Sequence, residues 1–110
     1  MQTVFVINRY GMGQGDETLG DLLMGAFLKK IWAKRDKPDM IILYNGGVKL
    51  LNQQSAYLDA LHGLEESGVE IAACGTCLDH YKIKDLPVGR KSNMAEIVDI
   101  MMTADKTITI

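Results

Sequence analysis

The sequence lacks the features that would direct it to a membrane or to a nucleic acid. None of its apolar runs approaches the roughly 20 residues that cross a bilayer. Its 12 basic and 14 acidic residues are well mixed, so they form no basic stripe for nucleic acid or for an anionic membrane surface. The first residues show no basic stretch followed by an apolar stretch and a cleavage site. We therefore predict a cytoplasmic protein with no nucleic-acid partner and no membrane.

Cysteine is scarce as well, since the chain has only Cys74 and Cys77. In the cytoplasm, two close cysteines seldom form a structural disulfide, so reactive or metal-binding thiols are the better interpretation. The chain also has no linker, repeat or low-complexity segment. This predicts one domain over residues 1–110, which at 47% hydrophobic residues can bury a core without cross-links.

Apolar runs that predict strands alternate with segments of helical spacing. The predicted strands are at residues 4–7, 40–44, 69–73, 86–88 and 106–110. Asp16 and Asn93 are predicted to cap the first and last long helices, and a short helix is expected to start near Leu78. The first helix should bury one apolar face, made of Leu19, Leu22, Leu23, Ala26, Phe27 and Ile31. The apolar positions of the other two long helices are Tyr57, Leu58, Leu61 and Leu64, and Ile97, Ile100 and Met101.

This alternation predicts an α/β fold of three layers, in which helices cover both faces of a doubly wound, mainly parallel, five-stranded sheet. Ligands of such sheets bind outside the carboxyl ends of the strands. Three loops leave strands at that edge, at Gly11–Gly15, Asn45–Gly47 and Cys74–Cys77. We expect the three loops to line one pocket, with the first and third strands close together in the sheet.

The cysteine pair lies where a strand ends and a helix begins. Unpaired backbone N–H groups and the positive end of a helix dipole stabilise a thiolate there, which favours nucleophilic sulfur chemistry. We expect Cys74, at the strand end, to be the more reactive thiol. His80 follows Cys77 by three residues and is expected to share its helix face. Buried structural cysteines and a thioredoxin-type redox pair stay open as alternatives.

Neither a zinc site nor a nucleotide site fits the residues well. Structural zinc takes four ligands, whereas Cys74, Cys77 and His80 supply three and His62 belongs to another helix, so we predict no metal. A zinc site shared between subunits is left open. The Gly11–Gly15 loop departs from the dinucleotide pattern and has no following lysine of a phosphate-binding loop. We predict no cofactor and interpret this loop as a tight turn whose amides are open to a small anion.

Four stretches together carry a resemblance to a known family. They are residues 13–20 (GQGDETLG), 45–50 (NGGVKL), 74–78 (CGTCL) and 92–94 (SNM). They span nearly the whole chain, which resembles the DsrE/DsrF-like sulfur-relay family, and most closely the carboxyl-terminal domain of the YedF-type selenium-metabolism proteins.

The resemblance implies a sulfurtransferase-like sulfur carrier that forms homo-oligomers. It would accept persulfide sulfur, or selenium, from a donor protein and pass it to an acceptor protein. The cysteine after the third strand, which corresponds to Cys74, would carry the sulfur. We expect Cys77 to be the second catalytic residue, either resolving the persulfide by forming a disulfide and releasing sulfide or tuning the pKa of Cys74. The expected pocket residues are Gly11, Gly13, Gly15, Asn45, Gly46, Gly47, Gly75, Thr76 and His80. The alternatives are a non-catalytic oligomeric binding module and a thiol-disulfide redox protein that uses the Cys-x-x-Cys pair.

Overall fold

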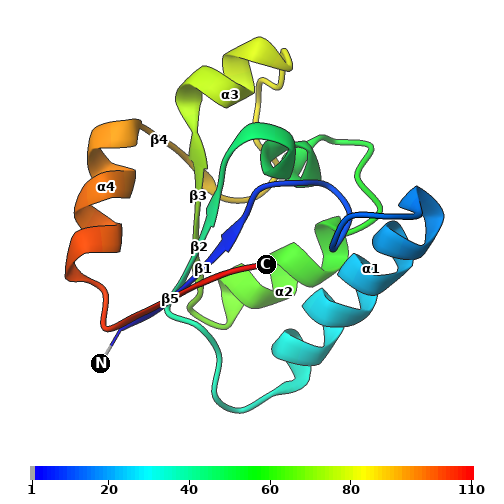
Figure 1. Cartoon of the computed structure of the whole chain (residues 1–110), viewed down its shortest axis with the longest axis horizontal. Coiled ribbons are helices and arrows are strands. Elements are labelled where there is room, and N and C mark those ends of the chain that lie inside the picture. Colours follow the sequence, from blue (N-terminus) through cyan, green and yellow to red (C-terminus); the bar gives the residue numbers. More distant parts are fainter. Residues whose placement is uncertain (1) are drawn as a thin grey trace.

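A five-stranded parallel sheet organises the computed structural model, which describes residues 2–110 (Figure 1). The strand order is β4-β3-β2-β1-β5, and every neighbouring pair is parallel. The strands are β1 (Thr3–Ile7), β2 (Met40–Leu43), β3 (Glu70–Cys74), β4 (Arg90–Ser92) and β5 (Lys106–Thr109). This confirms the α/β fold with a five-stranded sheet. It also places β2 between β1 and β3, which therefore are not neighbours.

Helices cover both faces of the sheet (Figure 1). On one face lie α1 (Glu17–Ala33) and α2 (Leu58–Glu66), which pack against each other, and on the other face lies α4 (Met94–Thr103). The short helix α3 (Gly75–His80) and the 3₁₀ helix η1 (Asn45–Leu51) follow β3 and β2 directly at the carboxyl edge. Within the described part of the chain, no helix has the length and apolar character needed to cross a membrane.

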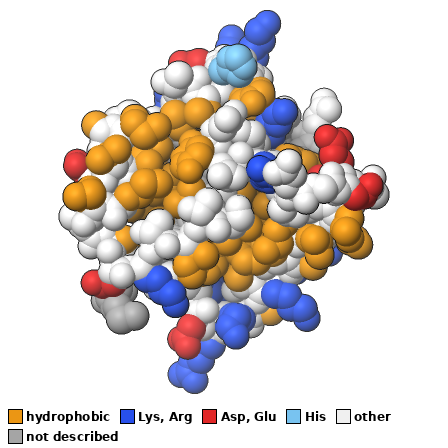
Figure 2. All heavy atoms as spheres, in the orientation of Figure 1, with side chains coloured by type: hydrophobic (Ala, Val, Ile, Leu, Met, Phe, Trp, Pro, Cys, Tyr) orange, Lys and Arg blue, Asp and Glu red, His pale blue; other side chains and the backbone are white. Residues whose placement is uncertain are grey.

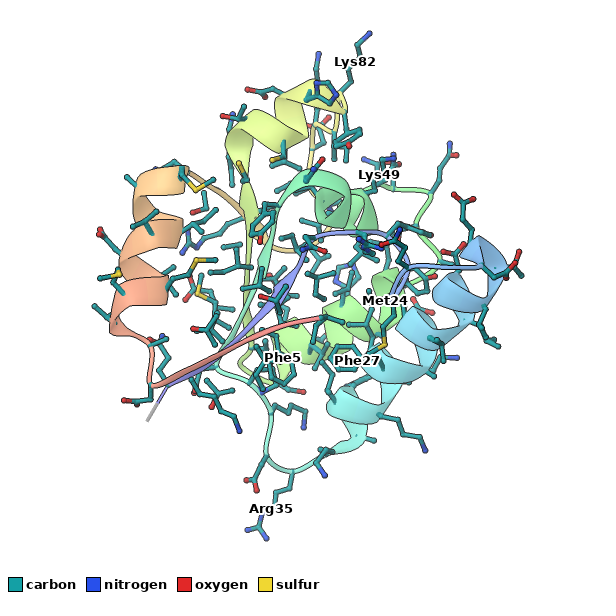
Figure 3. All side chains as sticks on the ribbon, in the orientation of Figure 1. Phe5, Met24, Phe27, Arg35, Lys49 and Lys82 are labelled. Carbon is teal, nitrogen blue, oxygen red and sulfur yellow. The ribbon has the colours of Figure 1, made fainter. Side chains whose placement is uncertain are left out.

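Side-chain alternation along the strands divides the core into two parts. In β3, Ile71 and Ala73 face α1 and α2, whereas Ala72 and Cys74 face α4. The larger part, on the α1 and α2 face, includes Phe5 and Phe27, whose ring centroids are 5.9 Å apart (Figure 3). Each strand therefore delivers consecutive residues to opposite sides of the molecule.

Both predicted helix caps are present. The backbone N–H of Leu19 donates to Asp16 Oδ2 at 2.7 Å, and that of Glu96 donates to Asn93 Oδ1 at 2.9 Å. Each side chain thus satisfies an amide in the first turn that has no partner within its helix. The two caps fix where α1 and α4 begin after the loops at the carboxyl edge.

The predicted buried face of the first helix is wrong for most of its members. Leu19, Leu22, Leu23 and Ala26 are exposed, Leu22 at 70% of its surface. The buried positions are Gly20, Met24, Leu28 and Ile31. The helix has two adjacent apolar stripes, and the chain packs on the one that contains Gly20, whose carbonyl accepts the backbone N–H of Met12 at 2.9 Å. Docking of the glycine-rich loop therefore sets the rotation of α1.

The predicted strand at residues 86–88 is also wrong, because β4 lies at Arg90–Ser92. Pro87 has no N–H to give to a ladder, and its segment is a loop instead. The strand itself is polar because it is an edge strand, pairing on one side with β3. Arg90 makes two hydrogen bonds of 2.8 Å to the carboxylate of Glu96 and one of 2.7 Å to Glu70. These contacts neutralise the charge of Arg90. A strand that contains such a charge has no apolar run by which the sequence could reveal it.

Candidate functional site

The two cysteines lie at the carboxyl end of β3, and both are free thiols. Cys74 is the last residue of the strand and the N-cap of α3, and its side chain belongs to the apolar cluster that faces α4. It is only 3% exposed. Cys77 lies in the first turn of α3, is half-buried, and packs against the clusters on both faces of the sheet. The pair therefore lies at the end of the sheet, with the more deeply buried thiol toward α4.

A backbone amide contacts the sulfur of Cys77. The N–H of Asn45, in η1, donates to Cys77 Sγ at 3.1 Å. Asn45 has a φ of 48°, in the left-handed region that few residues other than glycine and asparagine adopt readily. Burial raises the pKa of Cys77 above its ordinary value, and hydrogen bonding with the nearby Cys74 thiol raises it further. The Asn45 amide lowers this pKa, but the net shift is upward. Near neutral pH, Cys77 is therefore held mainly as the thiol.

Gly47 explains how η1 comes so close to the end of β1. A Cβ atom at this position would lie 2.0 Å from the carbonyl oxygen of Ile7, a separation that real side chains do not reach. At Gly46 the corresponding contact, with Arg9 Cα, would be an ordinary 3.4 Å. The absent side chain at Gly47 thus lets η1 lie across the sheet edge and brings Asn45 to Cys77.

A cavity of about 660 Å³ opens at the same edge of the sheet, on the side of α1 and α2. The glycine-rich loop forms one wall, in which Gly13 and Gly15 have positive φ values of 82° and 143° that favour glycine, as expected for a tight turn. The lining residues are Arg9, Tyr10, Gly11, Gly13, Gln14, Gly15, Asp16, Glu17, Gly20, Asp21, Lys49, Asn52, Gln54, Ser55, Tyr81 and Ile83.

The expectation of one pocket shared by all three loops is not met by this cavity. Gly11, Gly13 and Gly15 line it, and the other eight expected residues do not, namely Asn45, Gly46, Gly47, Cys74, Gly75, Thr76, Cys77 and His80. Two features separate them: β2 lies between β1 and β3, and the alternation along β3 turns Cys74 toward α4. All three loops do leave the sheet at its carboxyl edge.

Tyr81 connects the cavity to the cysteine pair. Its hydroxyl donates to Asn45 Oδ1 at 3.1 Å, and its ring lines the cavity. The ammonium group of Lys49 lies 4.6 Å from the centre of this ring, and the exposed His80 packs edge-on against it at 4.9 Å. Sequence reasoning identified neither Tyr81 nor Lys49 as a site residue. The available signal for Lys49 was its place in the stretch 45–50 that carries the family resemblance.

The described residues hold no group of three or more His, Cys, Asp or Glu side chains arranged to bind a metal ion. Two neighbouring thiols, a backbone amide directed at sulfur, and a polar cavity lie within one connected set of contacts.

Fold and site together define a doubly wound parallel α/β domain with a cysteine pair at the carboxyl edge of its sheet. The chain belongs to the DsrE/DsrF-like family, whose profile matches residues 1–110. Comparison with curated protein sequences finds no match to this chain.

Solved structures with a similar fold come from several organisms. MTH1491, a protein of unknown function from Methanobacterium thermoautotrophicum, superposes with a TM-score of 0.72 at 21% identity, covering 99% of this chain and 98% of that one. The ychN protein from E. coli gives a TM-score of 0.66 at 20% identity, with both chains covered completely. BT1422 from Bacteroides thetaiotaomicron, also of unknown function, gives 0.68 at 14% identity, covering 99% and 95%. At these identities the likeness shows the fold.

Proposed function

We propose that this chain is a sulfur carrier that accepts persulfide sulfur on Cys74 and transfers it to an acceptor protein. The observation that carries the proposal is the pair of free thiols at the end of β3 in a DsrE/DsrF-like domain. Selenium would undergo the same chemistry on the same residue. The proposed setting is the cytoplasm, where thiols are kept reduced.

The proposed transfer needs no external oxidant or reductant. The Cys74 thiolate attacks the terminal sulfur of a donor persulfide, R–S–SH, forming Cys74–S–SH and releasing the donor thiolate R–S⁻. An acceptor thiolate then attacks the terminal sulfur of Cys74–S–SH and regenerates the Cys74 thiolate. If the Cys77 thiolate instead attacks the inner sulfur, a Cys74–Cys77 disulfide forms and hydrosulfide leaves.

The raised pKa of Cys77 favours carriage over this second route. A thiol whose pKa lies above its ordinary value is a smaller fraction thiolate at neutral pH, so it attacks the neighbouring persulfide slowly. The burial of Cys74 acts in the same direction. The residue is only 3% exposed, so a persulfide formed on it would be shielded from small thiols in solution. Transfer then requires a docked partner or an outward displacement of α3.

Intact-mass spectrometry after exposure to a persulfide donor tests the proposal. We expect a mass gain of one sulfur atom, about 32 Da, in the wild type and in Cys77→Ser, and none in Cys74→Ser. Persulfide on Cys77→Ser should also persist longer than on the wild type, because the resolving thiol is gone. No sulfur gain in any variant, or a gain that depends on Cys77 alone, would contradict the assignment.

Thiol-disulfide exchange is the second candidate function, and the proximity of the two thiols favours it. A Cys-x-x-Cys pair at the start of a helix is typical of redox proteins. The two functions differ in how they use Cys77. A redox protein loses its activity when either cysteine is replaced, whereas the proposed carrier keeps sulfur loading in Cys77→Ser. Persulfide loading and disulfide reduction, measured on the same two variants, therefore separate them.

We also propose that the chain forms a homo-oligomer through α4. Met94, Val98 and Met102 form a row on its outer face and are 55%, 48% and 80% exposed. Figure 2 shows hydrophobic side chains gathered on this side of the molecule. The inner face of α4 already packs on the sheet, so a second, exposed apolar row on its outer face favours burial against another chain. Light scattering should give a mass well above 12.2 kDa, and Val98→Lys should lower it while Leu22→Lys on α1 should not. A monomer at micromolar concentration would contradict the proposal.

A further inference from the structure

The cavity beside α1 holds charges of both signs on different walls. Asp21 and Glu17 come from the first turns of α1, and Arg9 follows β1. Lys49, which is labelled in Figure 3, belongs to η1. Ion pairs among residues 2–110 involve only Arg90 and Lys91 on the basic side, so none of these four charges is neutralised by another side chain of that part of the chain. The walls therefore offer separated positive and negative groups to a ligand.

The two cations are held in place by contacts that leave most of their donors free. One guanidinium nitrogen of Arg9 donates to the carbonyl of Gly13 at 3.1 Å, which ties Arg9 to the glycine-rich loop. An arginine has five N–H donors, so the others are available to a ligand. Lys49 is steadied over the ring of Tyr81 by a cation–π contact, which uses none of its three N–H groups.

The shape and lining of the cavity suit a small organic molecule. Its volume of about 660 Å³ lies within the range of small-molecule sites. Tyr10, Tyr81 and Ile83 provide apolar surface. Tyr10 packs against Tyr57 in a tilted arrangement, with ring centroids 5.0 Å apart, and its hydroxyl accepts the N–H of Ala56. Apolar surface bounded by a few fixed charges is the usual composition of a specific binding site.

The charge pattern decides the class of ligand. Two cations and three carboxylates line the cavity, so a simple anion meets a net negative surface. The carboxylate of Asp16 is already used in capping α1. This leaves Glu17 and Asp21 as the free carboxylates of the lining, beside the two cations Arg9 and Lys49. We propose that this cavity binds a zwitterionic small molecule of the amino-acid or short-peptide class, whose carboxylate contacts Arg9 and Lys49 and whose ammonium group contacts Asp21.

Binding can be tested without sulfur chemistry. The experiment follows backbone amide shifts by NMR in the Cys74→Ser/Cys77→Ser double variant, which cannot carry sulfur, so its outcome does not depend on the function proposed above. The probes are S-methyl-L-cysteine and S-methylglutathione as zwitterions, inorganic phosphate and acetate as anions, and ethanolamine as a cation. We expect saturable shifts at residues 11–15 with the zwitterions only.

Charge-removing variants assign the contacts. Lys49→Gln and Asp21→Asn should each weaken zwitterion binding about tenfold, which is the usual effect of losing one hydrogen bond to a charged group. Lys29→Gln and Asp36→Asn, which change exposed charges outside the cavity lining, should leave it unchanged. The proposal is overturned if no zwitterion saturates the site, if phosphate binds as tightly, or if Asp21→Asn has no effect while Lys49→Gln weakens binding.

Discussion

Replacing Gly47 with alanine tests how the sheet edge positions the amide on Cys77. The new Cβ atom would lie 2.0 Å from the oxygen and 2.7 Å from the carbonyl carbon of Ile7, both backbone atoms of β1. Ordinary contacts start above 3 Å, so η1 must move by about 1 Å, at a cost near the upper end of the usual overpacking range, about 3 kcal/mol. The shift would also disturb the hydrogen bonds from the Tyr44 N–H to the Ile7 carbonyl and from the Gly47 N–H to the Tyr44 carbonyl.

The same displacement should remove the Asn45 amide from Cys77. Because this amide lowers the pKa of Cys77, its loss should raise that pKa further and slow alkylation of Cys77 at neutral pH. Urea denaturation measures the first effect, and the pH dependence of iodoacetamide labelling measures the second. Gly46→Ala is the matched control, because its Cβ atom would lie 3.4 Å from Arg9 Cα and should cost about 0.5 kcal/mol or less. Equal losses in the two variants, or a Gly47→Ala protein of wild-type stability and reactivity, would refute the reasoning.

Three further predictions concern the caps, the edge strand and the contact between cavity and thiol. Asp16→Ala should cost about 1 kcal/mol of unfolding free energy in urea, since it removes the cap on the Leu19 N–H, whereas the exposed Asp36→Ala should change little. Hydrogen bonds from Arg90 and Ser92 lower the pKa of Glu96 to about 2, so the stability that its carboxylate contributes is complete above about pH 4.5 and is lost as the pH falls toward 2. In Glu96→Gln the unfolding free energy should therefore fall less between these pH values, by about 1 kcal/mol after allowing for the solvent exposure of the pair. Tyr81→Phe should alter the alkylation rate of Cys77 through Asn45, whereas Tyr10→Phe should not.

Strands and caps were predictable because their signals are local. The apolar runs that form β1, β2 and β3 owe their pattern to burial on both faces, and the cap residues act within one helical turn. The edge strand β4 was misplaced because it carries Arg90, whose charge is paired with Glu70 and Glu96, two residues outside the strand. The rotation of α1 about its axis could not be predicted either. The helix buries the face that contains Gly20 because Gly20 contacts the glycine-rich loop, and the apolar pattern of the helix carries no information about that contact.

The sequence predicted which loops form the candidate site, but not how these loops are arranged relative to one another. Composition and spacing identified the three loops that meet at the carboxyl edge, including both cysteines. Which loops share a cavity depends on strand order and on which side of the sheet each last residue faces. A one-residue shift in the register of β3 would turn Cys74 to the other face, because strand side chains alternate. No local pattern in the sequence fixes that register.

Asn45 is the residue through which the two sides of the carboxyl edge can influence each other. Its backbone N–H contacts Cys77 and its side-chain oxygen accepts the hydroxyl of Tyr81 from the cavity wall. Its left-handed φ of 48° points both groups away from the direction that a regular extended residue would give them. A ligand that moves Tyr81 must therefore break that hydrogen bond or move Asn45, and the second outcome changes the environment of the Cys77 sulfur. We therefore expect any effect of cavity occupancy on the reactivity of the thiol pair to pass through the two hydrogen bonds of Asn45.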